Sequence, residues 1–227
     1  MFCMSNQSYL SLWCTDFPES SILERLGAFL STAPFSATKP GFTYLAIRAV
    51  DAAEAPILEH DLRAMPLDVA GIIELARDHL HNDSSFEVQC HWDLWVFDVA
   101  TTRWQLKPQA VEIFCHGEDY DHAFWREYGH LGVNFGFEHL FTGHAGLLGI
   151  GRVARRSAEG PEEARFLEAM AWPEHLEQYQ EKTRENIRRL LHWVGSIEKA
   201  VPLERICLWS EGEENFEARL DEILAAP

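Results

Sequence analysis

The sequence predicts an α+β protein with a ferredoxin-like βαββαβ core, an extended antiparallel sheet, and C-terminal helices packed on that core. Three observations lead to this fold class. The first hundred residues alternate between strand-like and helical apolar periods in the order βαββαβ, two further strand-like segments follow, and the period turns helical from Pro161 onward. With 227 residues and 47% apolar side chains, the chain can bury a sizeable core, and collagen-like and disordered classes are excluded.

The βαββαβ order rests on local apolar periodicity. A strand at 8–15 is followed by a helix at 18–33, in which Ile22, Leu26 and Phe29 recur at helical spacing. The remaining elements of this part are strands at 42–50 and 56–62, a helix at 66–81 and a strand at 86–98.

Two strands after residue 100 extend the predicted sheet. The 86–98 strand has apolar side chains at every even position up to Val96, so it has one buried and one polar face. The chain then turns and returns at 103–116, where Pro108 lacks an N–H and favours an edge position or a bulge. Residues 130–141 alternate in the same way.

The C-terminal third reads as mostly helical. Pro161 opens one helix and Pro173 ends it, and a long helix, a strand and a closing helix follow at 174–199, 203–209 and 214–224. The predicted divisions are a sheet-bearing region at 1–141, a glycine-containing loop at 142–160, and a helical region at 161–227 packed on the same core. We expect these helices to cover the apolar patch of Trp95 and Phe97, with a second copy of the chain, in a homodimer, as the alternative cover.

Charge is concentrated in one segment. The net charge is −17, and residues 51–100 alone carry 11 acidic side chains against two arginines, Arg63 and Arg77. Such a surface repels nucleic-acid phosphate and anionic lipid, so we expect neither nucleic acid nor a membrane as a partner. The acidic surface either keeps the protein soluble or binds a basic partner.

A cytoplasmic location is the expectation from targeting signals and cysteines. No signal-peptide pattern opens the sequence, and no apolar stretch is long enough to span a bilayer. The five cysteines have long, irregular spacings without a C-x-x-C pair, which favours reduced, buried thiols.

The polar face of the central strands supplies the first candidate site. If these strands are neighbours in register, carboxylates and an imidazole converge on one sheet face, as acid–base or metal chemistry requires. Gly132 and Gly136 would let a ligand or partner approach that face closely. The candidate ligand-binding residues are His91, Asp93, Glu112, Asn134 and Glu138. The alternative is an ordinary surface facing solvent or covered by helices.

A second candidate is a divalent metal site. Imidazole and carboxylate groups are common ligands of zinc, manganese and iron, and they are dense just after residue 115 and again near residue 140. The candidate ligands are His116, Asp121, His122, His139 and His144. A polar loop between strands explains the first group equally well. Arg152, which follows a glycine-rich stretch, is a candidate for holding an anionic group, against a structural turn as the alternative.

These observations favour a non-enzymatic protein-interaction module, such as an inhibitor or immunity-type partner of a basic protein. The acidic segment and the absence of catalytic motifs support this hypothesis. The alternative is a metal-binding domain or a metal-dependent enzyme that uses the histidine and carboxylate groups.

Overall fold

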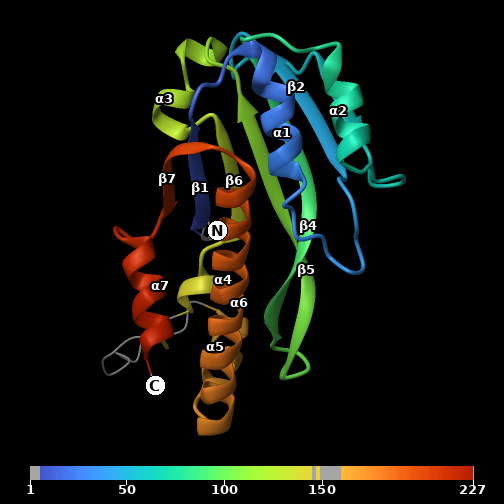
Figure 1. Cartoon of the computed structure of the whole chain (residues 1–227). Coiled ribbons are helices and arrows are strands. Elements are labelled where there is room, and N and C mark those ends of the chain that lie inside the picture. Colours follow the sequence, from blue (N-terminus) through green and yellow to red (C-terminus); the bar gives the residue numbers. More distant parts are fainter. Residues whose placement is uncertain (1–5, 145–146, 149–159, 227) are drawn as a thin grey trace.

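The chain forms an α+β structure around one seven-stranded antiparallel sheet (Figure 1). The computed structural model describes residues 6–144, 147–148 and 160–226. The strand order is β3-β2-β4-β5-β6-β1-β7. The strands are β1 (Gln7–Cys14), β2 (Tyr44–Ala49), β3 (Leu58–Asp61), β4 (Ser84–Asp98), β5 (Arg103–His116), β6 (Leu131–Phe137) and β7 (Leu203–Ser210). The predicted α+β class and antiparallel sheet are confirmed.

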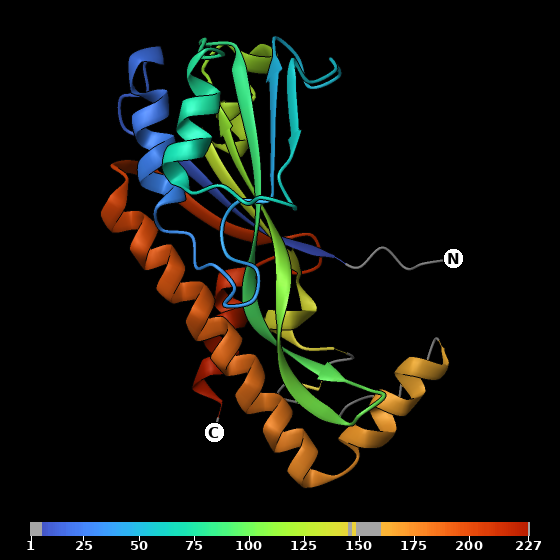
Figure 2. The same ribbon diagram turned by 90° about the vertical axis from the view of Figure 1, so that its right-hand side faces the viewer.

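Three helices, α1, α2 and α6, lie on the same side of the sheet (Figure 2). Their apolar stripes pack on the inward side chains of the strands, and the sheet and the C-terminal helix α6 share one core. The helices are α1 (Ile22–Leu30), α2 (Val69–Arg77), α3 (Trp125–Tyr128), α4 (His139–Thr142), α5 (Pro161–Met170), α6 (Pro173–Ala200) and α7 (Phe216–Ala225), with 3-10 turns η1 (Glu19–Ser21) and η2 (Tyr120–His122). In the described part of the chain, no helix has the length and apolar character needed to cross a bilayer.

The strand order departs from the predicted ferredoxin-like core. In that arrangement the four strands of the βαββαβ unit form one contiguous sheet. Here β5 and β6 are inserted between β4 and β1, and β1 pairs with β6 and β7 instead. Periodicity predicts which segments are strands, but pairing depends on contacts between distant segments, so the order of elements was insufficient to give the topology.

The structure also differs from the predicted end of the 130–141 strand and from the predicted place of Pro108 in the sheet. The strand expected at 130–141 ends at Phe137, because Gly136 has a φ of +84° and the chain turns into the short helix α4. Pro108 was expected at an edge or a bulge, yet β5 lies inside the sheet. Pro108 nevertheless lies at a local edge. The strand β6 pairs only with Glu112–Cys115 of β5, so at Pro108 the strand β5 has β4 alone as a neighbour.

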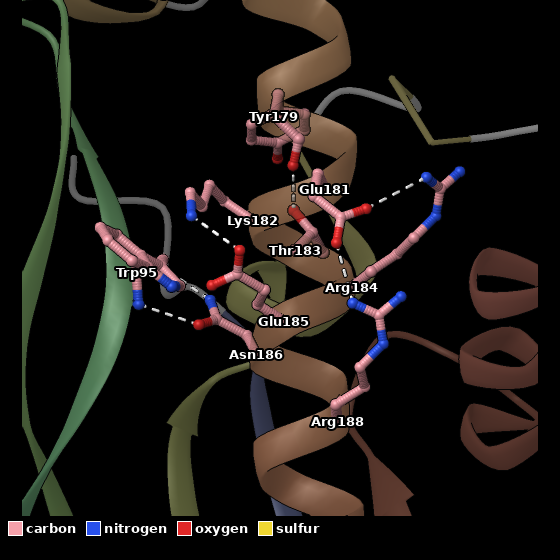
Figure 3. Close-up of polar contacts among 9 residues, drawn as sticks. All are labelled: Trp95, Tyr179, Glu181, Lys182, Thr183, Arg184, Glu185, Asn186 and Arg188. Atoms are coloured by element: carbon pink, nitrogen blue, oxygen red, sulfur yellow. Dashed lines mark hydrogen bonds and ion pairs between the residues drawn. The ribbon is translucent and has the colours of Figure 1, made fainter.

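The far ends of β4 and β5 form a two-stranded arm that packs against α5 and α6 (Figure 2). Asn186 of α6 is buried and holds this arm: it accepts a hydrogen bond from the backbone N–H of Trp95 at 2.8 Å and donates to the Trp95 carbonyl (Figure 3). Its amide also donates to the carbonyl of Leu140. The Phe97 ring contacts Phe166 of α5, with ring centroids 5.7 Å apart. The chain's own C-terminal helices therefore cover this patch.

Candidate functional site

A row of side chains crosses the sheet on the face opposite α1, α2 and α6, which we call the open face. In register, Gln89 lies beside Glu112, Glu112 beside Asn134, Asn134 beside Tyr9, and Tyr9 beside Trp209. The Asn134 amide donates to the Glu112 carboxylate at 3.1 Å. The Tyr9 and Trp209 rings stack with centroids 4.4 Å apart. The strand register thus assembles a carboxylate, an amide and a stacked aromatic pair in one line.

A hollow of about 280 Å³ lies next to this row, over Gly132. The neighbouring strand residues are Phe114 and Ser11, so the short side chains at 11 and 132 leave space beside larger ones. Aromatic rings form most of its walls: Tyr9, Phe114, His116, Phe124, Tyr128 and Trp209. This hollow therefore suits an apolar or aromatic group.

A second hollow, of about 170 Å³, lies on the other side of the row, over Gly136. Its lining mixes polar side chains, those of Gln7, Gln109, Glu112 and Asn134, with apolar groups such as Phe137. The Glu112–Asn134 pair thus lies between an aromatic hollow and a hollow of mixed polar and apolar lining.

The carboxylate of Glu112 has no cationic partner among the described residues. Partial burial raises the pKa of Glu112, the charge of Glu87 raises it further, and the hydrogen bond from Asn134 opposes both. Glu87 differs, because Arg48 binds it at 3.0 Å. Glu112 is therefore a partly desolvated negative charge that a ligand cation would stabilise.

Tyr9 reports the same negative environment. Burial raises the pKa of Tyr9 to about 12, helped by its hydrogen bond to Glu211 and by the charges of Glu211 and Glu112. Glu211 also accepts the Gln7 N–H at 2.9 Å, which holds its carboxylate over the end of β1. The open face therefore combines aromatic surface with negative potential.

His91 and Asp93 lie further along β4 and do not meet Glu112. The loop after α1 covers this stretch: Ser36 donates its N–H to the His91 carbonyl at 2.7 Å, and Ala37 donates to the Asp93 carboxylate at 3.0 Å. Burial and the nearby charge of Lys39 lower the pKa of His91. These two residues hold the loop against the sheet.

Glu138 is also absent from the open face. It precedes α4, is 7% exposed, and accepts the Gly212 N–H at 2.8 Å, so it ties the chain after β7 to the end of β6. The sequence placed it on the polar face by extending strand alternation past Gly136, where the strand is already ending.

Two of the predicted metal ligands, Asp121 and His122, come together with Asp51. One ligand-type atom from each of these side chains lies within 4.8 Å of the others. Asp121 and His122 have left-handed backbones, with φ of 43° and 55°, and the Asp121 N–H donates to the Val50 carbonyl at 2.8 Å. This contact brings the η2 turn next to the loop after β2 and so creates the cluster.

His116 does not join this cluster. It is buried against aromatic rings, its Nδ1 lies 2.9 Å from the Ser85 hydroxyl, and burial followed by the neighbouring His130 lowers its pKa to about 4. A neutral, buried imidazole with a hydroxyl partner explains His116 as a packing residue.

His139 and His144 lie in another place, at a cavity of about 360 Å³ between α4, α5, α6 and the β4–β5 arm. The His144 Nε2 lies 2.9 Å from the Glu163 carboxylate, and its backbone N–H donates to the Tyr179 hydroxyl. Within the described residues, neither histidine belongs to a group with metal-ligand geometry. Arg152 lies outside the described residues.

The sequence did not indicate the aromatic part of the open face or the role of Asp51. Tyr9 and Trp209 belong to strands that lie about two hundred residues apart and meet only through the β1–β7 pairing. The signal that was available is the pair of glycines on the polar face of β6, since a strand glycine often marks a close approach. No family model, no curated protein and no solved structure matches this chain.

Proposed function

We propose that this protein is a non-enzymatic interaction module that binds a basic partner protein on its open face. The observation that carries this proposal is the Glu112 carboxylate, which lies between two hollows and has no cationic partner in the described part of the chain. The net charge of −17 supports a basic partner, because long-range attraction speeds and orients the encounter. Tyrosine and tryptophan side chains, such as the stacked Tyr9–Trp209 pair, are enriched at protein-binding sites.

Filling the larger hollow tests this function. A Cβ at position 132 would lie 3.4 Å from the Leu10 carbonyl oxygen and 4.0 Å from the Phe114 side chain, so the β-carbon of Gly132→Val makes ordinary contacts. We expect this variant to be as stable as wild type or more stable by about 0.5–1 kcal/mol, because valine favours strands and glycine weakens them. Its affinity for the basic partner should fall at least about tenfold, since the added side chain occupies the hollow.

The measurement is capture from native extract, followed by titration of the purified partner over a range of salt concentrations. Gly195→Ala is the matched control, because it fills a glycine on α6 where no atom lies within 4 Å. Capture of a basic protein by wild type and by this control, weakened by salt and lost in Gly132→Val, supports the function. Equal capture by all three proteins, or capture of acidic proteins only, contradicts it.

The Asp51, Asp121 and His122 cluster supports a second candidate function, binding of a divalent transition metal. Two carboxylates and an imidazole are ligands that zinc and manganese accept, and the three side chains already lie within 4.8 Å of one another. We therefore expect Zn²⁺ or Mn²⁺ at about a hundred times its Kd to raise the melting temperature of the wild type by about 5–10 °C.

Asp121→Asn should remove this thermal shift, because it takes away one charged ligand. Asp221→Asn, an exposed change of the same kind on α7, should retain it. Elemental analysis of untagged protein provides an independent measurement. A wild-type protein with no bound metal and no thermal shift excludes this candidate.

A further inference from the structure

The two hollows of the open face are spaced for two side chains of one extended ligand. They lie over Gly132 and Gly136, which are four residues apart on β6. Four residues of strand span about 13 Å, whereas four residues of helix span about 6 Å. A single extended segment running along β6 can therefore reach both hollows with side chains at positions i and i+4, and a helical segment with that spacing cannot.

The chemistry of the two hollows differs. The hollow over Gly132 is walled by rings, among them the stacked Tyr9–Trp209 pair and Phe114, and has an apolar floor where Leu10 and Val133 contribute. The hollow over Gly136 has more polar groups in its walls, and among the described residues Glu112 is the one carboxylate that lines either hollow. An aromatic side chain matches the first hollow and a cation matches the second.

The groups around Glu112 favour a cation from outside the chain. Its hydrogen-bond partner, the Asn134 amide, carries no charge. The carboxylate of Glu87, whose charge acts on Glu112, already has Arg48 at 3.0 Å. A guanidinium or ammonium group beside Glu112 would complete a charge-assisted pair that the described chain leaves open.

We propose that the open face binds an extended segment of its basic partner that runs parallel to β6, in which an aromatic residue is followed, four positions later, by arginine or lysine. The aromatic ring enters the hollow over Gly132, and the cation enters the hollow over Gly136 beside Glu112. This inference rests on the proposed interaction function and specifies the sequence that the site recognises.

Peptide binding to the full chain tests this recognition. The probe is the peptide acetyl-Phe-Thr-Ala-Thr-Arg-amide, and two comparison peptides replace arginine with uncharged citrulline or phenylalanine with alanine. At millimolar peptide, we expect the backbone NMR signals of Gly132 and Gly136 to shift. The affinity for each comparison peptide should be weaker by about tenfold, which is the size of one charge-assisted hydrogen bond or one buried ring.

Variants locate the cation. Glu112→Gln should reduce the affinity for the arginine peptide about tenfold and leave the affinity for the citrulline peptide unchanged. Glu177→Gln, an exposed change of equal charge on α6, should alter neither affinity. Because the ratio of arginine to citrulline binding is measured within one protein, a general loss of stability does not imitate this result.

Several outcomes overturn the inference. They are no NMR shift at millimolar peptide, equal affinity for the arginine and citrulline peptides, and a wild-type dimer that Gly132→Val converts to a monomer, which would make a second copy the occupant. If a basic protein is still captured in a Gly132-dependent way, the interaction function stands and only the recognised sequence is wrong. If that capture fails as well, both are wrong.

Discussion

Acidification from pH 6.5 to about pH 4 is expected to lower the free energy of unfolding by several kcal/mol, because two buried histidines stay neutral in the folded chain. Burial lowers the pKa of His130 to about 4, and burial together with the neighbouring His130 lowers the pKa of His116 to about 4. Both side chains are less than a tenth exposed. Their usual pKa in an unfolded chain is near 6.5.

The direction follows from proton uptake. Between pH 6.5 and 4 the unfolded chain binds protons at these positions and the folded chain does not, so acid favours unfolding. The stabilisation is complete above pH 6.5 and is lost as the pH falls toward 4. A difference of about 2.5 pKa units corresponds to about 3 kcal/mol for each histidine.

The contacts of His130 explain why its neutral form is needed. Its Nδ1 accepts the Cys14 N–H at 3.0 Å, so that nitrogen has no proton and a protonated ring would break the bond. Trp125 stacks on the ring, with centroids 4.3 Å apart. The Glu118 carboxylate, 3.9 Å from Nε2, favours the charged form, but its side chain is 42% exposed and screened by water.

Urea unfolding at several pH values between 7.5 and 4 measures this effect. His130→Phe should be less stable at pH 7 and should show a smaller loss of stability on acidification. His122→Gln, a change at an exposed histidine, should lose stability in the same way as wild type. A free energy of unfolding that stays constant from pH 6.5 to 4.5 would contradict the assignment of buried neutral histidines.

The local elements of this fold could be predicted from sequence because their signals are local. The stripe of Ile22, Leu26 and Phe29 in α1 is fully buried, and so, or nearly so, are the even-numbered apolar residues of β4 from Phe86 to Leu94. The strand order could not be predicted in this way. The partners of β1 lie more than a hundred residues away along the chain, and nothing in its own alternation distinguishes β6 from β4 as a neighbour.

The candidate site was predictable to the same extent. Alternation placed Glu112 and Asn134 on one face, and the register then made them neighbours. The same alternation placed His91 on that face. His91, however, lies two residues further along β4 than Gln89, the neighbour of Glu112, and the loop after α1 covers β4 there. The partner of Asp121 and His122 is Asp51, seventy residues earlier, which only the tertiary structure brings close.

Replacement of Trp193 by alanine is expected to lower the free energy of unfolding by about 3–5 kcal/mol while unfolding stays a single transition. Trp193 is 2% exposed and joins α6 to the sheet, with its ring centroid 5.3 Å from that of Trp92 and 5.4 Å from that of Phe135. Its indole N–H also donates to the Thr32 hydroxyl at 3.0 Å. The alanine variant would leave a cavity in a core that the strands and the C-terminal helices share, and it would remove one of the two hydrogen bonds of the Thr32 hydroxyl.

Trp172 is the matched control, because it precedes the same helix and is 64% exposed. Trp172→Ala should change the free energy of unfolding by less than about 0.5 kcal/mol. Circular dichroism and tryptophan fluorescence should follow one coincident urea transition in both variants, since a core shared by α6 and the sheet unfolds as one unit. If Trp193→Ala instead separates the loss of helix from the loss of sheet, then residues 161–227 fold as a domain of their own, and the packing of α6 on β4 stabilises a contact between domains rather than a single core.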